Sequence, residues 1–452
     1  MRIMKFGGTS LGSAERIRDA AAIVSRAPRP VLVVASAMTG ATNDLLASAA
    51  KAAAGRRDEA IAILDRLEAR HLAAGETLGV LGSRVAGLPA DTPDPGTFVK
   101  ARFDEARQRL EGVALLGELT DRTRDAIAAT GELSSSVLLA AILPGSYSDV
   151  RRVMRTDDAF GAAAPDMGEI EALCHAADPA LVSGIVVTQG YIGRTASGIT
   201  TTLGRGGSDY SAAILGAALG AGEIEIWTDV DGMLTADPRV VPGARLLPEV
   251  SFEEASELAY FGAKVLHPAT IRPALARGIP VRVLNTFQPE GRGTLIRDVV
   301  AAPASGVRAV ASRKGITVVQ IANPRMLMAH GYSARVFDVF GRHKVSVDLI
   351  ATSEVSISLT VDDASGLAPV TRELGTFAEV SVIPGQAIVA VVGSGMRDRP
   401  RVAATVFGAL GDINVTMISM GASDRNLSFV VKETDADEAT RRLHRTLFED
   451  PR

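Results

Sequence analysis

The chain has 452 residues, of which 47% are hydrophobic and 22% charged, and its formal net charge is −4. This length allows about three domains of ~150 residues, and the composition excludes a disordered chain. The balanced charge and the 4% aromatic content offer no basic or stacking surface, so no nucleic-acid partner is expected. Cys174 is the only cysteine and the six histidines show no ligand spacing, so no protein metal site is predicted.

The N-terminal segment lacks the apolar stretch of a signal peptide, and no run reaches the ~18 apolar residues of a membrane span. We therefore expect a cytoplasmic protein with no membrane partner.

Apolar, β-branched runs alternate with helical patterns through the first three hundred residues. The run at 30–35 (PVLVVA) is hydrophobic throughout, as in strands buried on both faces of a parallel sheet. Ser13 is placed to cap a helix that ends near residue 26. The other expected strands are 2–6, 185–189, 223–227 and 279–284; the other expected helices are 43–80 (broken at Gly55), 208–221, 251–261 and 268–277, with a loop at 82–97. This alternation predicts an α/β domain with a mainly parallel central sheet over residues 1–298.

The pattern changes after Leu295, and residues 299–306 form a Pro- and Ser-containing link. Two similar blocks follow, and each has short strands framing two helices, which fits a ferredoxin-like βαββαβ module. The expected domains are 315–383 and 384–452, the second completed by a strand at 307–314. The expected strands are 307–312, 316–321, 345–350, 355–361, 379–383, 387–392, 413–418 and 427–432, and the expected helices are 332–343, 365–374, 400–410 and 435–447.

The first candidate motif is KFGGTS (5–10), which follows the first strand and precedes a helix. Its two glycines let backbone N–H groups approach an anion, and a helix N-terminus adds partial positive charge. Lys5 supplies the point charge that a transferring phosphoryl group requires. The alternative is an ordinary turn with an exposed lysine.

The second motif, TTTLGRGGSDY (200–210), is the stronger signal. A Thr-rich strand enters a loop with three glycines, and Ser208 or Asp209 is expected to cap the helix that follows. Arg205, set among glycines, can bind a carboxylate in bidentate fashion. A plain N-cap is the alternative for Asp209.

Further polar residues follow the strand at 223–227. The segment IWTDVDG (226–232) ends that strand in a turn, and DPR (237–239) comes soon after. In open α/β sheets, ligands bind at the carboxyl ends of the strands. Lys264 lies among small and apolar residues, which favours a ligand-facing charge over a solvated one. The chain has no Gly-x-x-x-x-Gly-Lys-Ser/Thr motif, so it is not a P-loop enzyme.

Together these motifs resemble those of aspartate kinases (aspartokinases), and the likeness covers nearly the whole chain. The segment SVDLIATSEVSISLTVD (346–362) resembles the effector-binding ACT module of lysine-sensitive aspartokinases. The other matching stretches are KFGGTS (5–10), SAMTGATNDLL (36–46), GELSS (131–135), TTTLGRGGSDYSAA (200–213), WTDVDG (227–232), DPR (237–239) and FGAKVLHP (261–268).

The resemblance implies an amino-acid-kinase fold followed by two ACT domains in a monofunctional enzyme. It implies ATP-dependent phosphorylation of the L-aspartate β-carboxylate to 4-phospho-L-aspartate, the first step toward lysine, threonine and methionine. Lys5 and Asp209 match catalytic positions. The substrate-binding matches are Thr42, Glu132, Arg205 and Ser208, and the ATP-binding matches are Lys5, Gly7, Gly8, Thr9, Ser10, Thr228, Asp229, Leu234, Arg239 and Lys264. Leu234 departs from the family pattern, because relatives often have a tyrosine in this turn.

ATP and Mg²⁺ are the expected cofactors. A carboxylate is already nucleophilic, so the barrier lies in bringing two anions together and in stabilising charge on the phosphoryl oxygens. Lys5, Lys264, the glycine-loop amides and Mg²⁺ would supply that stabilisation. No protein ligand is assigned to Mg²⁺, because phosphates and water can carry most of its coordination.

The resemblance also implies feedback inhibition by an amino acid, with lysine favoured and threonine the rival. Asp348 and Glu354 offer two anions for the two ammonium groups of lysine. The matching effector positions are Met326, Gly331, Ser333, Ser346, Val347, Asp348, Ser353 and Glu354. A homodimer, or a dimer of dimers, through the ACT domains is expected. The competing hypotheses are a related kinase with another acceptor and a non-catalytic amino-acid sensor of the same fold.

Overall fold

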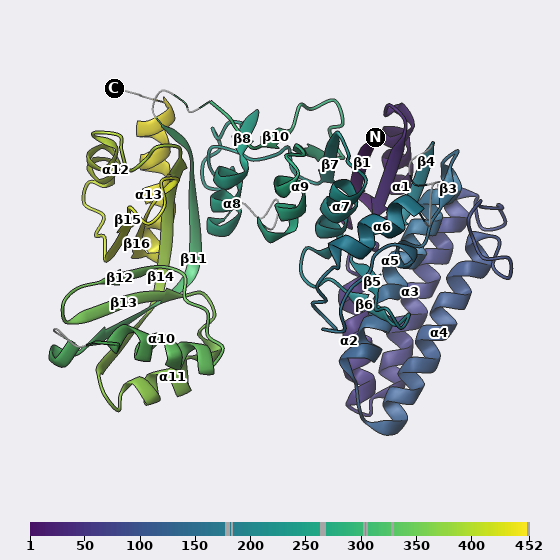
Figure 1. The fold of residues 1–452 in the computed structure, drawn as a ribbon, viewed down its shortest axis with the longest axis horizontal. Helices are drawn as coiled ribbons and strands as arrows, with labels where there is room; N and C mark the ends of the chain where they lie inside the picture. The colour runs from purple at the N-terminus through teal and green to yellow at the C-terminus, as the bar shows by residue number, and fades with distance from the viewer. Residues whose placement is uncertain are drawn as a thin grey trace. The chain divides into compact units, whose positions relative to one another are not determined.

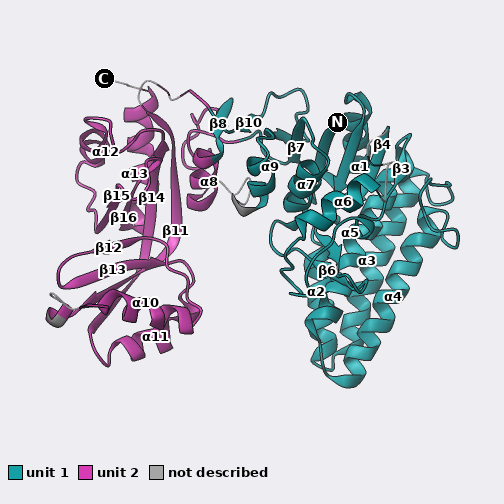
Figure 2. Ribbon diagram, in the orientation of Figure 1, with its two compact units in different colours: residues 1–232, 248–252, 265–299 teal, residues 233–247, 253–264, 300–452 magenta. Residues whose placement is uncertain are grey.

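The computed structural model describes residues 1–176, 181, 184–262, 268–301, 303, 306–326 and 330–449. Contacts between residues divide the chain into two compact units (Figure 2). The first unit contains residues 1–232, 248–252 and 265–299, and the second contains 233–247, 253–264 and 300–452. Two segments that precede residue 265 in the sequence, 233–247 and 253–264, therefore pack with the C-terminal part of the chain.

The first unit is built on an eight-stranded sheet with the order β3-β4-β2-β1-β7-β9-β10-β8 (Figure 1). β1 runs parallel to β2 on one side and to β7 on the other. Only the β9–β10 pair is antiparallel among the pairs described, so the expectation of a mainly parallel sheet is confirmed. The strands are β1 (Arg2–Phe6), β2 (Val31–Ala35), β3 (Ser146–Tyr147), β4 (Ile185–Gln189), β7 (Glu223–Thr228), β8 (Glu249–Ser251), β9 (Val281–Asn285) and β10 (Thr294–Arg297).

Several predicted elements of this unit are confirmed. Ser13 caps α1 (Ala14–Arg26), because its side chain accepts a hydrogen bond from the N–H of Arg16. The expected helix at 43–80 is present as α2 (Ala41–Ala53) and α3 (Arg57–Leu78), with the break at Gly55. The other matches are α7 (Gly207–Ala218), α8 (Phe252–Phe261) and the pair η4 (Pro268–Ile271) and α9 (Arg272–Ala276).

Two long helices were not predicted from the sequence. α4 (Pro95–Leu116) begins inside the expected 82–97 loop, and α5 (Asp121–Ile142) follows it. α5 is long and apolar enough to cross a membrane, but 83% of its apolar window is buried in the protein. It packs against α2, α4, β2 and β4 (Figure 1). Residues 127–140 of this helix are all buried, so this stretch has no solvent-facing side and its sequence lacks the amphipathic period that reveals a surface helix.

Smaller elements complete the first unit beside the main sheet. β5 (Ile192–Arg194) and β6 (Thr200–Thr202) form an antiparallel hairpin. α6 (Met167–Ala176) precedes β4, and two short 3₁₀ helices, η1 (Thr9–Leu11) and η2 (Val150–Arg152), follow β1 and β3.

The second unit is built on a six-stranded antiparallel sheet with the order β12-β13-β11-β14-β16-β15. Helices cover two separate apolar clusters on it, one with α10 and α11 and one with α12 and α13. The strands are β11 (Val307–Ala322), β12 (Ile350–Thr352), β13 (Ser356–Val361), β14 (Glu379–Gly393), β15 (Met417–Met420) and β16 (Asn426–Lys432); the helices are α10 (Tyr332–Arg342), α11 (Leu367–Leu374), α12 (Val402–Leu410) and α13 (Ala436–His444). The α/β architecture with a repeated C-terminal module is confirmed.

Two features of this sheet differ from expectation. The paired short strands expected at 307–312 and 316–321, and at 379–383 and 387–392, form the single long strands β11 and β14. The strands expected at 345–350 and 413–418 are wrong in position, because β12 holds only residues 350–352 and β15 only Met417–Met420. Because β11 and β14 each run through both modules, the domain limits 315–383 and 384–452 stay predictions.

The helix α8 is tied to strands of the second unit by buried polar contacts. The carboxylate of Glu254 is fully buried and accepts hydrogen bonds from Arg308 on β11 and from the hydroxyl of Ser394 after β14. One turn later, Glu257 accepts hydrogen bonds from Ser423 and from Asn426 on β16. These contacts explain why residues 253–264 belong to the C-terminal unit.

Candidate active site

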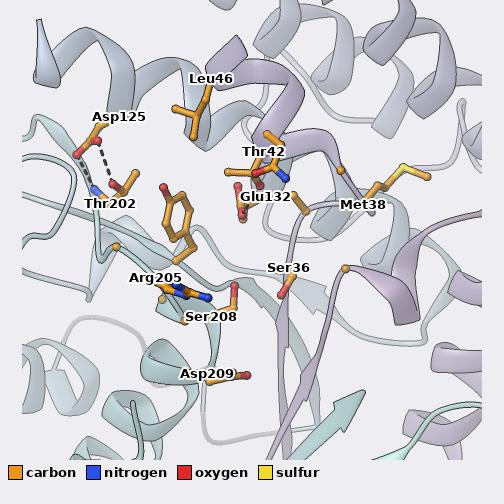
Figure 3. A pocket seen from close by; sticks show the side chains of 18 of the residues that line it. Ser36, Met38, Thr42, Leu46, Asp125, Glu132, Thr202, Arg205, Ser208 and Asp209 are labelled. Atoms are coloured by element: carbon orange, nitrogen blue, oxygen red, sulfur yellow. Dashed lines mark hydrogen bonds between the residues drawn. The ribbon is translucent and has the colours of Figure 1, made fainter. Parts of the chain in front are cut away.

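The carboxyl ends of the central parallel strands meet at one edge of the first sheet. Phe6 at the end of β1 is level with Ala35 at the end of β2 and with Trp227 near the end of β7. The chain segments that follow these strands therefore lie together, as ligand-binding loops do in open α/β sheets. A pocket of about 690 Å³ opens here, between the segment after β2, helix α5 and the start of α7 (Figure 3).

Lys5 and Asp209 form an ion pair in the wall of this pocket. Lys5 Nζ lies 2.7 Å from Asp209 Oδ1, and both side chains are largely buried. Lys5 comes from the central strand β1 and Asp209 from the first turn of α7. The predicted catalytic pair is thus brought together, with the lysine held in place by a charged partner and aimed at the pocket.

Glu132 is a buried carboxyl without a counter-ion. It lies on α5, is 3% exposed, and its Oε1 accepts a hydrogen bond from Thr42 Oγ1 at 3.4 Å. Its Oε2 is buried and has no hydrogen-bond partner in the part of the chain described. Burial raises the pKa of Glu132 to about 8. A carboxyl with an unused acceptor in a cavity can receive an ammonium group.

The glycine loop presents Arg205 and Ser208 to the same pocket. Gly204 and Gly206 both have positive φ angles, +75° and +72°, which other residues rarely adopt. Arg205 is exposed, and no carboxylate among the described residues pairs with its guanidinium. The four predicted substrate positions, Thr42, Glu132, Arg205 and Ser208, all line this cavity.

The expected capping role of Ser208 or Asp209 is wrong. α7 begins at Gly207, its N-cap is Gly206, and no side chain caps it. Because the left-handed glycine turns the chain into the helix, Asp209 is free to pair with Lys5.

Several residues that line the pocket were not predicted from the sequence. Asp125 is 2% exposed and hydrogen bonds to Thr202 across the pocket wall (Figure 3). Arg124, beside it on α5, and Tyr191, which has a φ of 69°, also line the cavity. Asp125 precedes Glu132 by two helical turns, a spacing that points to a shared face only once 121–142 is known to be a helix.

The predicted nucleotide positions are spread over several segments. Thr228 ends β7 and its hydroxyl donates to the carboxylate of Asp229, the next residue. Gly8 lines the pocket, and its carbonyl accepts a hydrogen bond from Thr39. Ser10 is fully buried and bonds to the Trp227 carbonyl and to Thr286. Gly7 follows β1, and its N–H donates to the Trp227 carbonyl; Thr9 begins η1. Leu234 and Arg239 belong to the second unit. Lys264 lies outside the described residues.

The predicted effector positions all belong to the second unit. Gly331 is the N-cap of α10 and Ser333 lies in the first turn of that helix. Asp348 accepts a hydrogen bond from the hydroxyl of Tyr260 on α8, and its other oxygen is buried without a partner among the described residues. Met326 ends η5 (Pro324–Met326), Ser346 and Val347 precede β12, and Ser353 and Glu354 form the turn between β12 and β13.

No group of three or more His, Cys, Asp or Glu side chains within the described ranges is placed to hold a metal ion. The side chains described here therefore do not form a full ligand set for Mg²⁺, which commonly keeps water and phosphate oxygens as ligands.

Comparison with known proteins gives the same reading along the chain. The amino acid kinase family model matches residues 1–285, and an ACT domain model matches 319–368 and 389–447. The lysine-sensitive aspartokinase 3 of Escherichia coli is 38% identical over 466 residues, which cover 99% of both chains. The chloroplastic aspartokinase 2 of Arabidopsis thaliana is 36% identical over 99% of this chain and 84% of the plant protein.

Solved structures of E. coli aspartokinase III are similar over the same length. The structure described as a complex with aspartate and ADP (R-state) has a TM-score of 0.84 at 38% identity and covers 99% of this chain and 100% of that one. The complex with lysine and aspartate (T-state) has a TM-score of 0.81 at 37% identity and covers 99% of both chains.

We predict that Glu132→Gln stabilises the empty protein at alkaline pH. The folded protein binds a proton at Glu132 up to about pH 8, whereas the unfolded chain releases it near pH 4.5. Stability therefore falls as pH rises between these values, because the unfolded chain is stabilised by ionising this carboxyl in water while the buried group in the folded protein stays neutral. In thermal unfolding between pH 6 and 9, the melting temperature of the variant should exceed that of the wild type by a difference that grows with pH, by several degrees.

The exposed Glu118 provides the control. Glu118→Gln should track the wild-type curve at every pH, and a pH-independent difference for Glu132→Gln would contradict the prediction.

Proposed function

The chain belongs to the aspartokinase family, and its activity is the ATP-dependent phosphorylation of aspartate. We propose that the pocket binds aspartate between Glu132 and Arg205. The observation that carries this proposal is two groups in one cavity that have no oppositely charged partner among the described residues: a buried carboxyl on α5 and an exposed guanidinium on the glycine loop. Aspartate has one ammonium group and two carboxylates, so it complements both. The aspartate-bound E. coli structures support this assignment.

Glu132 would bind the substrate ammonium group, with Thr42 orienting its carboxylate through the hydrogen bond to Oε1. An ammonium group beside Glu132 favours the ionised carboxylate, so binding lowers the raised pKa of this residue. Arg205 would bind one substrate carboxylate through its planar fork of N–H groups, and Ser208 lies beside it in the cavity wall.

Lys5 would stabilise the phosphoryl group in transfer. The attacking β-carboxylate oxygen forms a bond to the γ-phosphorus of ATP while the bond to the ADP oxygen breaks, and no proton has to move. Negative charge gathers on the phosphoryl oxygens, where the ammonium group of Lys5 is most effective. Asp209, at 2.7 Å, holds Lys5 Nζ in position and keeps its charge compensated before substrates bind.

The nucleotide assignments rest on the family motifs and on the ADP-bound relative. Thr228 and Asp229 lie at the carboxyl edge of the sheet, next to β1, in the first unit. Gly7, Gly8, Thr9, Ser10, Leu234, Arg239 and Lys264 complete the proposed set. Mg²⁺, when bound with ATP, would neutralise phosphate charge and be held mainly by phosphates and water.

The competing hypotheses are less well supported. A non-catalytic sensor would not need the buried Lys5–Asp209 pair, and the full-length relatives are aspartokinases. Trapping of an acyl phosphate by hydroxylamine, with ATP and each candidate acceptor, separates aspartate from other acids.

For regulation, we propose that the first ACT module binds lysine at Asp348 and Glu354. The lysine-bound relative supports this proposal. Asp348 is half-buried, and one of its oxygens has no partner among the described residues. Its other oxygen is engaged by the phenol of Tyr260, so an arriving ammonium group must share or displace that hydrogen bond. The carboxylate of Glu354, at the exposed β12–β13 turn, would meet the second ammonium group.

We also propose self-association through the ACT sheet, as a dimer or a dimer of dimers, in the cytoplasm. The outer strands β12 and β15 expose Ile350, Ile418 and Met420. Apolar side chains on unpaired edge strands favour pairing with another chain.

We predict that Lys5→Ala lowers kcat by about 10²- to 10³-fold, the typical effect of losing one preorganised transition-state contact. The aspartate KM should change much less, because Lys5 acts on charge that develops in the transition state. Steady-state kinetics with coupled ADP detection measures both constants. Circular dichroism should match the wild type, and an unchanged kcat would contradict the assignment.

We predict that Arg205→Lys raises the aspartate KM by about 10-fold or more, because lysine lacks the bidentate fork. The ATP KM should stay within about twofold. Equal losses for both substrates would instead show that the glycine loop had collapsed.

For the effector site, we predict opposite effects of two substitutions on lysine inhibition. Glu354→Ala should remove most of the lysine sensitivity, because one ammonium group loses its anion. Tyr260→Phe should lower the lysine concentration for half inhibition by about 3- to 10-fold, because the competing hydrogen bond to Asp348 is gone. Activity is titrated with lysine, threonine and both.

Glu379→Ala, at another exposed glutamate of the same module, is the matched control, and lysine should inhibit this variant as strongly as the wild type. Unchanged lysine inhibition in both Glu354→Ala and Tyr260→Phe would contradict the assignment of this site. Inhibition of the wild type by threonine but not by lysine would show that threonine is the effector.

A further inference from the structure

Asp125 is a buried carboxylate that accepts hydrogen bonds from Thr202, at the end of strand β6, and from the backbone of Gly161. Its Oδ2 accepts from the N–H of Thr202 at 2.8 Å and from the N–H of Gly161 at 2.9 Å. Its Oδ1 accepts from Thr202 Oγ1 at 2.9 Å. Asp125 is 2% exposed, and burial raises its pKa. A carboxylate with three donors holds its partners far more firmly than a single neutral hydrogen bond does.

Of the two partners of Asp125, Thr202 directly precedes the loop that carries the arginine proposed to bind substrate, and Gly161 lies close to Gly204 of that loop. Thr202 is the last residue of β6, and the next residues, 203–207, form the loop that carries Arg205. The Thr202 carbonyl accepts a hydrogen bond from the N–H of Ala163, so the loop is also tied to the segment that contains Gly161.

The same two segments are packed tightly against each other. A Cβ on Gly204 would lie 3.2 Å from the carbonyl oxygen of Gly161, so there is little room between them. Asp125 thus joins both segments to α5, the helix that carries Glu132 two turns later (Figure 3).

We propose that Asp125 is a positioning residue that sets the distance between Arg205 and Glu132 by holding the glycine loop to α5 through Thr202 and Gly161. This inference rests on the proposed role of Arg205 in binding the aspartate carboxylate. Glu132 is set by the rigid, buried helix, whereas Arg205 stands on a glycine-rich loop with wide backbone freedom. Without the hydrogen bonds of Asp125, the distance between Glu132 and Arg205, which bind opposite ends of aspartate, is no longer fixed.

The test compares Asp125→Ala with Asp125→Asn in steady-state kinetics. Loss of the carboxylate should raise the aspartate KM by about 10- to 100-fold, lower kcat by no more than about 5-fold, and leave the ATP KM unchanged. Asparagine should restore most of the aspartate KM. Its amide oxygen can accept from both backbone N–H groups, and its NH₂ can donate to Thr202 Oγ1.

A double substitution with Arg205→Lys identifies the route of the effect. If Asp125 acts through Arg205, Asp125→Ala should raise the aspartate KM by less than about 3-fold in the Arg205→Lys background. Thr202→Val, which removes only the hydroxyl, should give a smaller rise than Asp125→Ala. Glu118→Ala removes an exposed carboxylate shortly before the same helix and should be indistinguishable from the wild type.

An unchanged aspartate KM in Asp125→Ala, equal damage in Asp125→Asn, or full additivity with Arg205→Lys would each overturn the proposal. A normal aspartate KM in Arg205→Lys alone would instead overturn the substrate role of Arg205, on which the proposal depends. If Asp125→Ala does not fold, Asp125→Asn and Thr202→Val still decide the question.

Discussion

The parallel hydrogen bonding of β1 to β2 on one side and to β7 on the other determines where chemistry can occur in this chain. Parallel strands must all leave the sheet at the same edge, so the segments after Phe6, Ala35 and Thr228 are brought together. The side chain of Lys5, one residue before the end of β1, therefore reaches a pocket whose other walls come from α5 and α7. The helices on the sheet carry the remaining functional groups to that edge.

Some of the ionisable groups in this pocket have oppositely charged or hydrogen-bonding partners, and others do not. Lys5 and Asp209 neutralise each other, and Asp125 accepts three hydrogen bonds. Glu132 and Arg205, in contrast, have no opposite charge beside them among the described residues. A buried carboxyl without a partner lowers stability, which is why its pKa rises when the pocket is empty. In the proposed binding mode, the ammonium group of a zwitterionic substrate would remove that penalty, so the instability of the empty site would favour binding of an amino acid.

Helix α8 shows how a regulatory region can reach the catalytic sequence. Its side chains at 254, 257 and 260, one turn apart, bond to Arg308 and Ser394, to Ser423 and Asn426, and to Asp348. The amino acid kinase family model includes this helix, yet its packing assigns it to the C-terminal unit. An effector that takes Asp348 from Tyr260 would act directly on a helix whose sequence continues into the FGAKVLHP motif.

The sequence alone predicted the fold class, the mainly parallel sheet and the repeated C-terminal module, because uniformly apolar strands and glycine-rich turns are local signals. Lys5, Asp209 and Arg205 were candidates from their motifs, and Glu132 was a candidate from the resemblance to aspartokinases. Helix α5 was missed because its buried stretch, residues 127–140, has no solvent-facing side and therefore no amphipathic period. The merging of short strands into β11 and β14 was missed because strand length depends on partners far along the chain. Only the tertiary structure decided that Asp125 would meet Thr202 and Gly161, 77 and 36 residues away, and that Tyr260 would meet Asp348, because each such contact requires packing between segments that no local pattern relates.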